Sequence, residues 1–156
     1  MSRFILSGNE AYPLYFTQSG NAVDLPGYGE SEERSGNRES FLLELLESLS
    51  LVKPVIVSPS MSGRYSWPLV VNHSDKLSGF VAVAPVGIVS FEAQLQGVAL
   101  PTLAIWGSND SIVPVAQAKR LCQQMPDAEL NVGVILYGCP QSFVICGQRI
   151  NFISIY

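Results

Sequence analysis

Charged side chains are scarce in this sequence, which narrows its range of partners. Only 14% of the 156 residues are charged, the formal net charge is −4 at pH 7, and no basic run occurs. Proteins that bind nucleic acid through its phosphates need a basic surface, so we expect no nucleic-acid partner. Apolar residues make up 47% of the chain, which is typical of a folded domain and not of a disordered one.

Cysteine and long apolar runs are also scarce. The three cysteines, Cys122, Cys139 and Cys146, form an odd set without metal-type spacing, so we expect neither a disulfide framework nor a metal site. Reduced thiols are typical of the cytoplasm and nucleus. The longest apolar run, residues 80–91, contains Pro85 and is too short to span a bilayer, and no secretory signal begins the chain. We therefore expect a soluble cytoplasmic or nuclear protein without a membrane segment.

Strand and helix patterns alternate from residue 38 to residue 138. The patterns predict helices over 38–51, 64–71 and 113–125, and strands over 55–57, 80–84, 102–106 and 132–137. Asn37 is a suitable N-cap for the first helix, and residues 12–23 suggest a hairpin. This alternation predicts an α/β fold, a mostly parallel sheet with helices on both faces, in a single domain spanning residues 1–156.

Three serines spaced by two follow the predicted strand at 55–57. Ser58, Ser60 and Ser62 precede Gly63, and a helix pattern starts directly after them. A strand, a tight turn with a serine at the bend and a helix form a nucleophile elbow, in which small residues must flank the serine. Ser60 holds the nucleophile position, although serines replace the usual flanking glycines. A polar turn that only caps the helix gives the same pattern.

A serine nucleophile needs a base and an acid that orients the base. Asp110 ends the second strand after the elbow, in a Gly-Ser-Asn-Asp turn, and is the candidate acid; it is also an ordinary turn former. The only histidine, His73, falls about two turns along the helix that follows the elbow, on the side leading away from Ser60. We expect His73 to be a surface or helix-end residue. Cys139 has no basic neighbour that would activate it as a substitute base.

The loop Asp24-Leu25-Pro26-Gly27-Tyr28-Gly29-Glu30-Ser31 is similar to the Asp-Leu-Pro-Gly-x-Gly-x-Ser loop of α/β-hydrolases. Together with Ser-Pro-Ser-Met-Ser-Gly at 58–63 and Gly-Ser-Asn-Asp at 107–110, it resembles the alpha/beta hydrolase domain-containing protein 14 family over residues 22–138. The resemblance implies an α/β-hydrolase-like fold, Ser60 as nucleophile, Asp110 as acid and the Met61 amide as oxyanion donor. It implies ester hydrolysis or deacylation of acylated lysine, with coenzyme A as a possible acyl acceptor and no other cofactor.

Two departures from the family pattern lead us to expect an incomplete fold at both ends. The first long strand and the His-Gly oxyanion loop of the family have no counterpart before Asp24, and the family histidine is replaced by Cys139-Pro140-Gln141-Ser142. The atypical segment 139–156 fits an altered reading frame, and the missing first block fits an omitted exon. Without its central strand, the sheet would expose unpaired edge groups and be prone to aggregation.

Three functions therefore remain open from the sequence. The first is a serine hydrolase or acyltransferase. The second is a catalytically inactive variant that binds other proteins through the retained sheet. The third is an unrelated flavodoxin-like domain whose serine-rich turn binds a phosphate at a helix N-terminus, although only Gly63 would let the backbone approach that phosphate closely.

Overall fold

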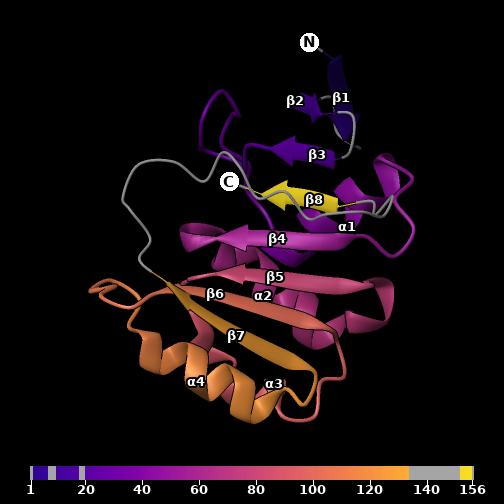
Figure 1. Cartoon of the computed structure of the whole chain (residues 1–156). Helices are drawn as coiled ribbons and strands as arrows, with labels where there is room; N and C mark the ends of the chain where they lie inside the picture. Colours follow the sequence, from indigo (N-terminus) through magenta and orange to yellow (C-terminus); the bar gives the residue numbers. More distant parts are fainter. Residues whose placement is uncertain (1, 7–9, 18–19, 134–151, 156) are drawn as a thin grey trace.

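The structure is a computed structural model that describes residues 2–6, 10–17, 20–133 and 152–155, the first twenty residues and 152–155 by their backbone alone. The strands of this described part form one sheet in the order β1-β2-β3-β8-β4-β5-β6-β7 (Figure 1). They are β1 (Ser2–Leu6), β2 (Glu10–Thr17), β3 (Gly20–Val23), β4 (Val55–Pro59), β5 (Gly79–Val83), β6 (Thr102–Gly107), β7 (Ala128–Gly133) and β8 (Phe152–Ile155).

The helices connect the parallel strands. They are α1 (Arg38–Ser48), α2 (Gly63–Asn72), α3 (Glu92–Leu95) and α4 (Val115–Gln124), with 3-10 turns η1 (Ser60–Ser62), η2 (Ser74–Lys76) and η3 (Ile88–Ser90). The Asn37 side chain accepts a hydrogen bond from the Glu39 amide and caps α1, which confirms the predicted N-cap. Pro68 lies inside α2. Because proline has no amide hydrogen, the Arg64 carbonyl loses its usual helical donor.

Strands β3, β8, β4, β5, β6 and β7 run parallel to one another, whereas β2 pairs antiparallel with both β1 and β3 at one side of the sheet. The predicted hairpin is therefore present as β2 and β3. Parallel strands end at the same edge of the sheet, so the segments that follow β3, β4 and β6 lie along one edge. This edge is where α/β folds place their ligand sites.

The chain's last described strand occupies the middle of the sheet. β8 lies between β3 and β4, with Val23 paired to Ile155 and Val55 paired to Phe152 (Figure 1). We had expected the sheet to lack a central strand and to expose unpaired edges there. That expectation is wrong for this position, because β8 is parallel to both neighbours and satisfies their backbone groups.

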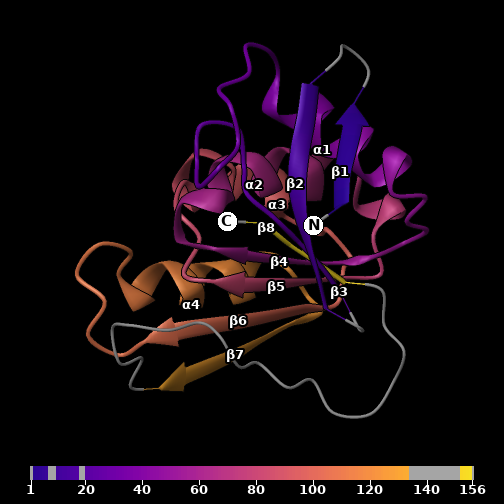
Figure 2. The ribbon, with the colours of Figure 1, turned by 90° about the horizontal axis from the view of Figure 1, so that it is seen from above.

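The four described helices pack on the same face of strands β4 to β7 (Figure 2). The core between them and the sheet contains two tryptophans without exposed surface, Trp67 of α2 and Trp106 of β6. The Trp67 ring meets Phe80 of β5 edge-on, with centroids 5.2 Å apart. The predicted α/β-hydrolase-like sheet with packed helices is confirmed. Helices over the second face, which we also expected, are not found among the described residues.

Most predicted elements lie within a few residues of their expected bounds, and one strand is displaced. We expected a strand over 132–137, but β7 covers Ala128–Gly133, and residues 134–137 lie outside the described chain. In β7 the half-buried Ala128 and Leu130 alternate with the exposed Glu129 and Asn131. The strand is therefore amphipathic, as is typical of a strand at the side of a sheet, and it lacks the continuous apolar run of a strand that is buried on both faces.

Candidate active site

Ser60 lies at the junction of β4 and the helical segment that starts with η1. Its backbone φ is +45°, a left-handed conformation that non-glycine residues rarely adopt, and its side chain is exposed. Among the described residues, three other non-glycine residues share a positive φ, namely Ser50, Lys53 and Ala84. Only Ser60 among these four stands directly between a strand and a helix. The strained strand-turn-helix geometry matches a nucleophile elbow.

The residues around Ser60 are small because the turn is closely packed. Ser58 and Ser62 are almost fully buried. A Cβ atom on Gly63 would collide with the carbonyl oxygen of Val86. The Val86 amide donates a 2.8 Å hydrogen bond to the Ser60 carbonyl, so the loop after β5 fixes the turn in place.

Ser58 has a partner that sequence reasoning missed. Its hydroxyl lies 2.7 Å from the hydroxyl of Ser66 in α2, and both residues have no exposed surface. A buried hydroxyl needs a hydrogen-bond partner, and each serine provides one for the other. The serine that replaces the usual glycine at position 58 therefore has a structural role. The spacing of eight residues between two small polar residues was the only signal for it in the sequence.

Met61, whose amide is the predicted oxyanion donor, lies at the start of the helical segment. Met61 is the second residue of the helical segment, and the first amides of a helix have no acceptor within it. Such amides at a helix start are typical donors to a developing oxyanion. The His-Gly loop that would supply a second donor has no counterpart in the described residues that precede Asp24. Met61 therefore remains the one amide that we predict for this role.

Asp110 is held by backbone amides in the turn after β6. Its Oδ1 atom accepts hydrogen bonds from Ile112 at 2.9 Å and from Val113 at 2.8 Å. The indole of Trp106 donates to the Val113 carbonyl at 2.8 Å and ties this turn to the core. Within the described chain, no residue hydrogen-bonds the second oxygen, Oδ2. This oxygen is available to orient a base.

Ser60 and Asp110 follow strands that are one strand apart. Ser60 comes directly after β4, and Asp110 comes three residues after β6, with β5 between them. Neighbouring strands are about 4.8 Å apart, so the ends of β4 and β6 are about 10 Å apart. A gap of this size requires a third group, such as an imidazole, to connect the acid to the serine.

His73 does not occupy that gap. It is the C-cap of α2, whose first turn lies at the elbow, and ten helical residues span about 15 Å. Its Nε2 atom lies 3.0 Å from the Glu39 carboxylate of α1, which also accepts a 2.9 Å hydrogen bond from Asn72. The prediction that His73 is a helix-end residue is confirmed. Cys139 lies outside the described residues.

The loop 24–31 follows β3 at the same edge of the sheet. Ser31 is buried and donates a 2.8 Å hydrogen bond to the Asp24 carbonyl. Gly29 has a φ of +56°, and a Cβ atom there would collide with the Asp24 carboxylate. The aspartate, glycine and serine of this motif therefore hold the loop in a compact fold.

Neither a metal site nor a membrane span is found in the parts of the chain that the structure describes. No three His, Cys, Asp or Glu residues group there in a way that could hold a metal ion. None of the described helices is long and apolar enough to cross a bilayer. Cys122 is a free thiol, and its burial raises its pKa.

Comparison with known proteins finds several relatives that belong to one family. It is 41% identical over 108 residues to ABHD14A of Danio rerio, and 37% identical over 97 residues to human ABHD14B, a candidate protein-lysine deacylase by its name. The chain matches the ABHD14 family. These matches cover 65% and 57% of the chain but only 40% and 46% of the two relatives, so the chain spans less than half of their length. No model of a protein family matches it.

Solved structures support the hydrolase fold of this ABHD14-like chain. A predicted CIB-like hydrolase from Thermoplasma acidophilum aligns with a TM-score of 0.65 and 25% identity, over 70% of this chain and 57% of that one. Est816, described as an N-acyl homoserine lactone degrading enzyme, aligns with a TM-score of 0.66 and 12% identity, over 85% and 92% of the two chains. At 12% identity, the similarity to Est816 concerns the fold alone.

Proposed function

We propose that this chain carries the nucleophile and acid of a serine hydrolase or acyltransferase site. Ser60 is the nucleophile, Asp110 is the orienting acid, and the Met61 amide is an oxyanion donor. The observation that supports this most strongly is the φ of +45° at an exposed serine between β4 and η1. A strained serine in this position is typical of an elbow that presents its hydroxyl to a substrate.

The substrate class is an ester or an acylated lysine side chain. Support comes from human ABHD14B, whose name refers to lysine deacylation. In such a reaction the Ser60 Oγ attacks the acyl carbonyl and gives its proton to a base, and the Met61 amide stabilises the oxyanion that forms. The oxyanion then collapses, the bond to the alcohol or lysine nitrogen breaks, and this group leaves with the proton from the base. Water or a second acceptor then takes the acyl group from Ser60. Coenzyme A, implied by the family resemblance alone, is one candidate acceptor.

The rate of this reaction is limited by the base that must accept the Ser60 proton. Within the 156 residues the only imidazole belongs to His73, which faces Glu39 at the far end of α2. Loss of the base in serine hydrolases lowers the rate by about 10³–10⁶-fold. We therefore expect acylation of Ser60 in this chain to be slow and to require a reactive acyl or phosphonyl donor.

A fluorophosphonate probe tests the proposal, because it forms a covalent bond with the hydroxyl of an exposed, correctly oriented serine. The full chain should be labelled slowly, Ser60→Ala should not be labelled, and Ser108→Ala should be labelled like the unchanged chain. Ser108 is a matched control because it is an exposed serine in the Asp110 turn. Equal labelling of the chain and of Ser60→Ala, or labelling of neither, would refute the proposal.

A second function, protein binding without catalysis, is favoured by one observation. The 3.0 Å contact between His73 and Glu39 leaves Ser60 without an imidazole in this chain. In that case Ser60→Ala should leave every interaction of the chain unchanged, whereas the first function requires that it abolish acyl transfer. Hydrolysis of an activated ester by the chain and by Ser60→Ala separates the two, because only the first function predicts a difference.

A further inference from the structure

A pocket of about 410 Å³ lies on the helix layer, is not lined by Ser60, and has no role in the proposed acyl transfer. Its lining is a mixture of cationic, polar and apolar groups contributed by the N-terminus of α1, the exposed side of α2 and the loop around η3. The lining residues are Asn37, Arg38, Arg64, Pro68, Gly87, Ser90 and Phe91. Its volume lies within the range of small-molecule sites.

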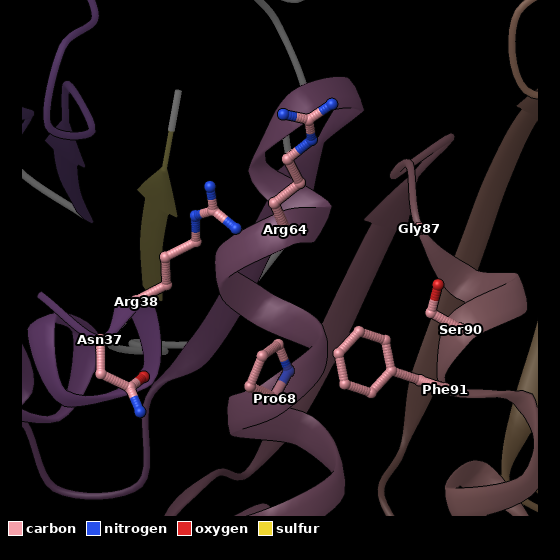
Figure 3. A pocket seen from close by; sticks show the side chains of 7 residues that line it. All are labelled: Asn37, Arg38, Arg64, Pro68, Gly87, Ser90 and Phe91. Atoms are coloured by element: carbon pink, nitrogen blue, oxygen red, sulfur yellow. The ribbon is translucent and has the colours of Figure 1, made fainter.

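Two arginines from different helices line this pocket. Figure 3 shows Arg38 of α1 and Arg64 of α2 reaching toward the same end of it. None of the seven lining residues is acidic. Two guanidinium groups in one hollow repel each other, and an anion between them removes that repulsion. The pocket is therefore cationic in a chain whose net charge is −4.

Two acidic residues that follow lining residues directly in the sequence are bound to other side chains. Glu39 of α1 contacts His73 at 3.0 Å, and Glu92 of α3 contacts Arg120 at 3.6 Å. No described residue forms an ion pair or a hydrogen bond with the guanidinium group of Arg38 or Arg64. The charge of the two arginines is thus not neutralised within the described chain.

Arg38 is also oriented by an aromatic ring. Its guanidinium carbon lies 5.5 Å from the centroid of the Tyr65 ring, within the range of a cation–π contact. A guanidinium that packs on a ring keeps the N–H donors at its edge, where they can form paired hydrogen bonds with two oxygens of one anion. The ring therefore reduces the conformational entropy that Arg38 would lose on binding.

The other end of the pocket is apolar and flat. Phe91 points toward the ring of Pro68 in Figure 3, and both residues are half-buried. Pro68 interrupts the hydrogen bonding of α2 and places a ring where most helix surfaces carry a flexible side chain. Two rings side by side offer a surface for a flat apolar group.

We propose that this pocket binds a small organic anion: a phosphate or carboxylate held by Arg38 and Arg64 and carried on a flat apolar group that packs against Phe91 and Pro68. The ligand would lie beside the loop that supports the elbow. Gly87 lines the pocket, and the preceding residue, Val86, accepts a 3.0 Å hydrogen bond from the Trp67 indole and donates to the Ser60 carbonyl.

The Trp67 indole N–H provides a direct readout, because its acceptor adjoins the pocket wall. In ¹H–¹⁵N spectra of the full chain, phenyl phosphate should shift the Trp67 indole signal saturably, with a dissociation constant of about 1 mM or lower. The Trp106 signal should not move, since that indole donates to Val113 in another turn. Binding of benzoate shows whether a carboxylate can replace the phosphate. Phenol lacks the anionic group of the proposed ligand, and inorganic phosphate lacks its flat apolar group.

Substitution of the two arginines distinguishes specific binding in this pocket from unspecific attraction of an anion to the protein surface. Arg38→Gln with Arg64→Gln should weaken phenyl phosphate binding about a hundredfold, because each of the two lost charged hydrogen bonds costs about a factor of ten. The matched control is Lys76→Gln with Lys119→Gln, which removes two exposed charges outside the pocket and leaves the Glu92–Arg120 ion pair intact. Phenol and inorganic phosphate should each bind at least tenfold more weakly than phenyl phosphate.

Three results would overturn the proposal: no saturable shift with either aromatic anion, equal binding by the two double variants, or equal binding of phenol and phenyl phosphate. Phe91→Ala checks the apolar end separately and should weaken phenyl phosphate but not inorganic phosphate. None of these measurements depends on acylation of Ser60, so the pocket and the proposed acyl transfer can fail independently.

Discussion

The amide of Val86 donates a 2.8 Å hydrogen bond to the carbonyl oxygen of Ser60, and this contact joins the elbow to the loop after β5. The contact requires the two backbones to approach closely, and Gly63 permits that approach because any side chain there would meet the Val86 carbonyl. The left-handed backbone of Ser60 is thus held by its surroundings.

Gly63→Ala should therefore destabilise the chain. The new methyl group must displace the backbone at Val86, and overpacking of this kind costs about 1–3 kcal/mol. Urea unfolding followed by tryptophan fluorescence measures the loss. Gly133→Ala is the matched control, because a Cβ atom there meets no atom of the described residues within 4 Å. Equal stability of the two variants would show that the close approach at the elbow is absent.

The buried pair of Ser58 and Ser66 should behave as a unit. Replacing either serine with alanine leaves the other hydroxyl buried without a partner, which costs about 1–3 kcal/mol. Replacing both removes the unsatisfied group, so the double variant should be less destabilised than the sum of the two single variants. Unfolding of all four chains gives the interaction free energy. Additive effects would mean that the two hydroxyls do not bind each other.

The negative charge of Asp110 should contribute little to stability, whereas its acceptor atom in the turn should contribute more. Asp110→Asn keeps an acceptor at Oδ1 for the amides of Ile112 and Val113, so it should unfold at nearly the same urea concentration as the unchanged chain. Asp110→Ala loses the acceptor and should cost about 1 kcal/mol, as for other capping side chains. A large loss of stability in Asp110→Asn would indicate that the carboxylate charge itself stabilises the turn.

The central position of β8 predicts a strong effect of proline. Ile153→Pro removes a backbone donor from a strand with parallel neighbours on both sides, so the chain should unfold at much lower urea concentration or fail to fold. Ile153→Val, which keeps the donor, should be nearly neutral.

Hydrogen exchange provides the more specific test of this strand. In the unchanged chain the amides of Val55 to Val57 should be protected, and in Ile153→Pro they should exchange faster while those of β6 and β7 stay protected. Unchanged protection in β4 would place residues 152–155 outside the sheet.

Local patterns predicted the part of the fold that depends on local physics. The amphipathic stripe of Phe41, Leu42 and Leu45, with Asn37 before it, predicted α1 together with its cap, because burial and capping both act within a few residues. The short apolar strands β4, β5 and β6 were predicted as well, because the burial of a strand is visible in its local run of apolar residues. The prediction of helices over the second face of the sheet rested only on the alternation of strand and helix patterns along the chain.

The parts that the sequence did not reveal depend on contacts between distant residues. Nothing in the four residues of β8 shows that they pair with β3 and β4, which lie more than 90 residues earlier. The Ser58–Ser66 pair and the Val86 contact with Ser60 likewise arise only when α2 packs on the sheet. By contrast, the position of His73 followed from counting helical turns.

Mapping a fluorophosphonate adduct by peptide mass spectrometry tests the central claim most directly, that Ser60 is a presented nucleophile without its histidine base. The account predicts a slow adduct on Ser60, formed at the same rate in His73→Gln as in the unchanged chain, because that imidazole contacts Glu39 and not the serine. An adduct on another serine, or a rate that falls in His73→Gln, would contradict it.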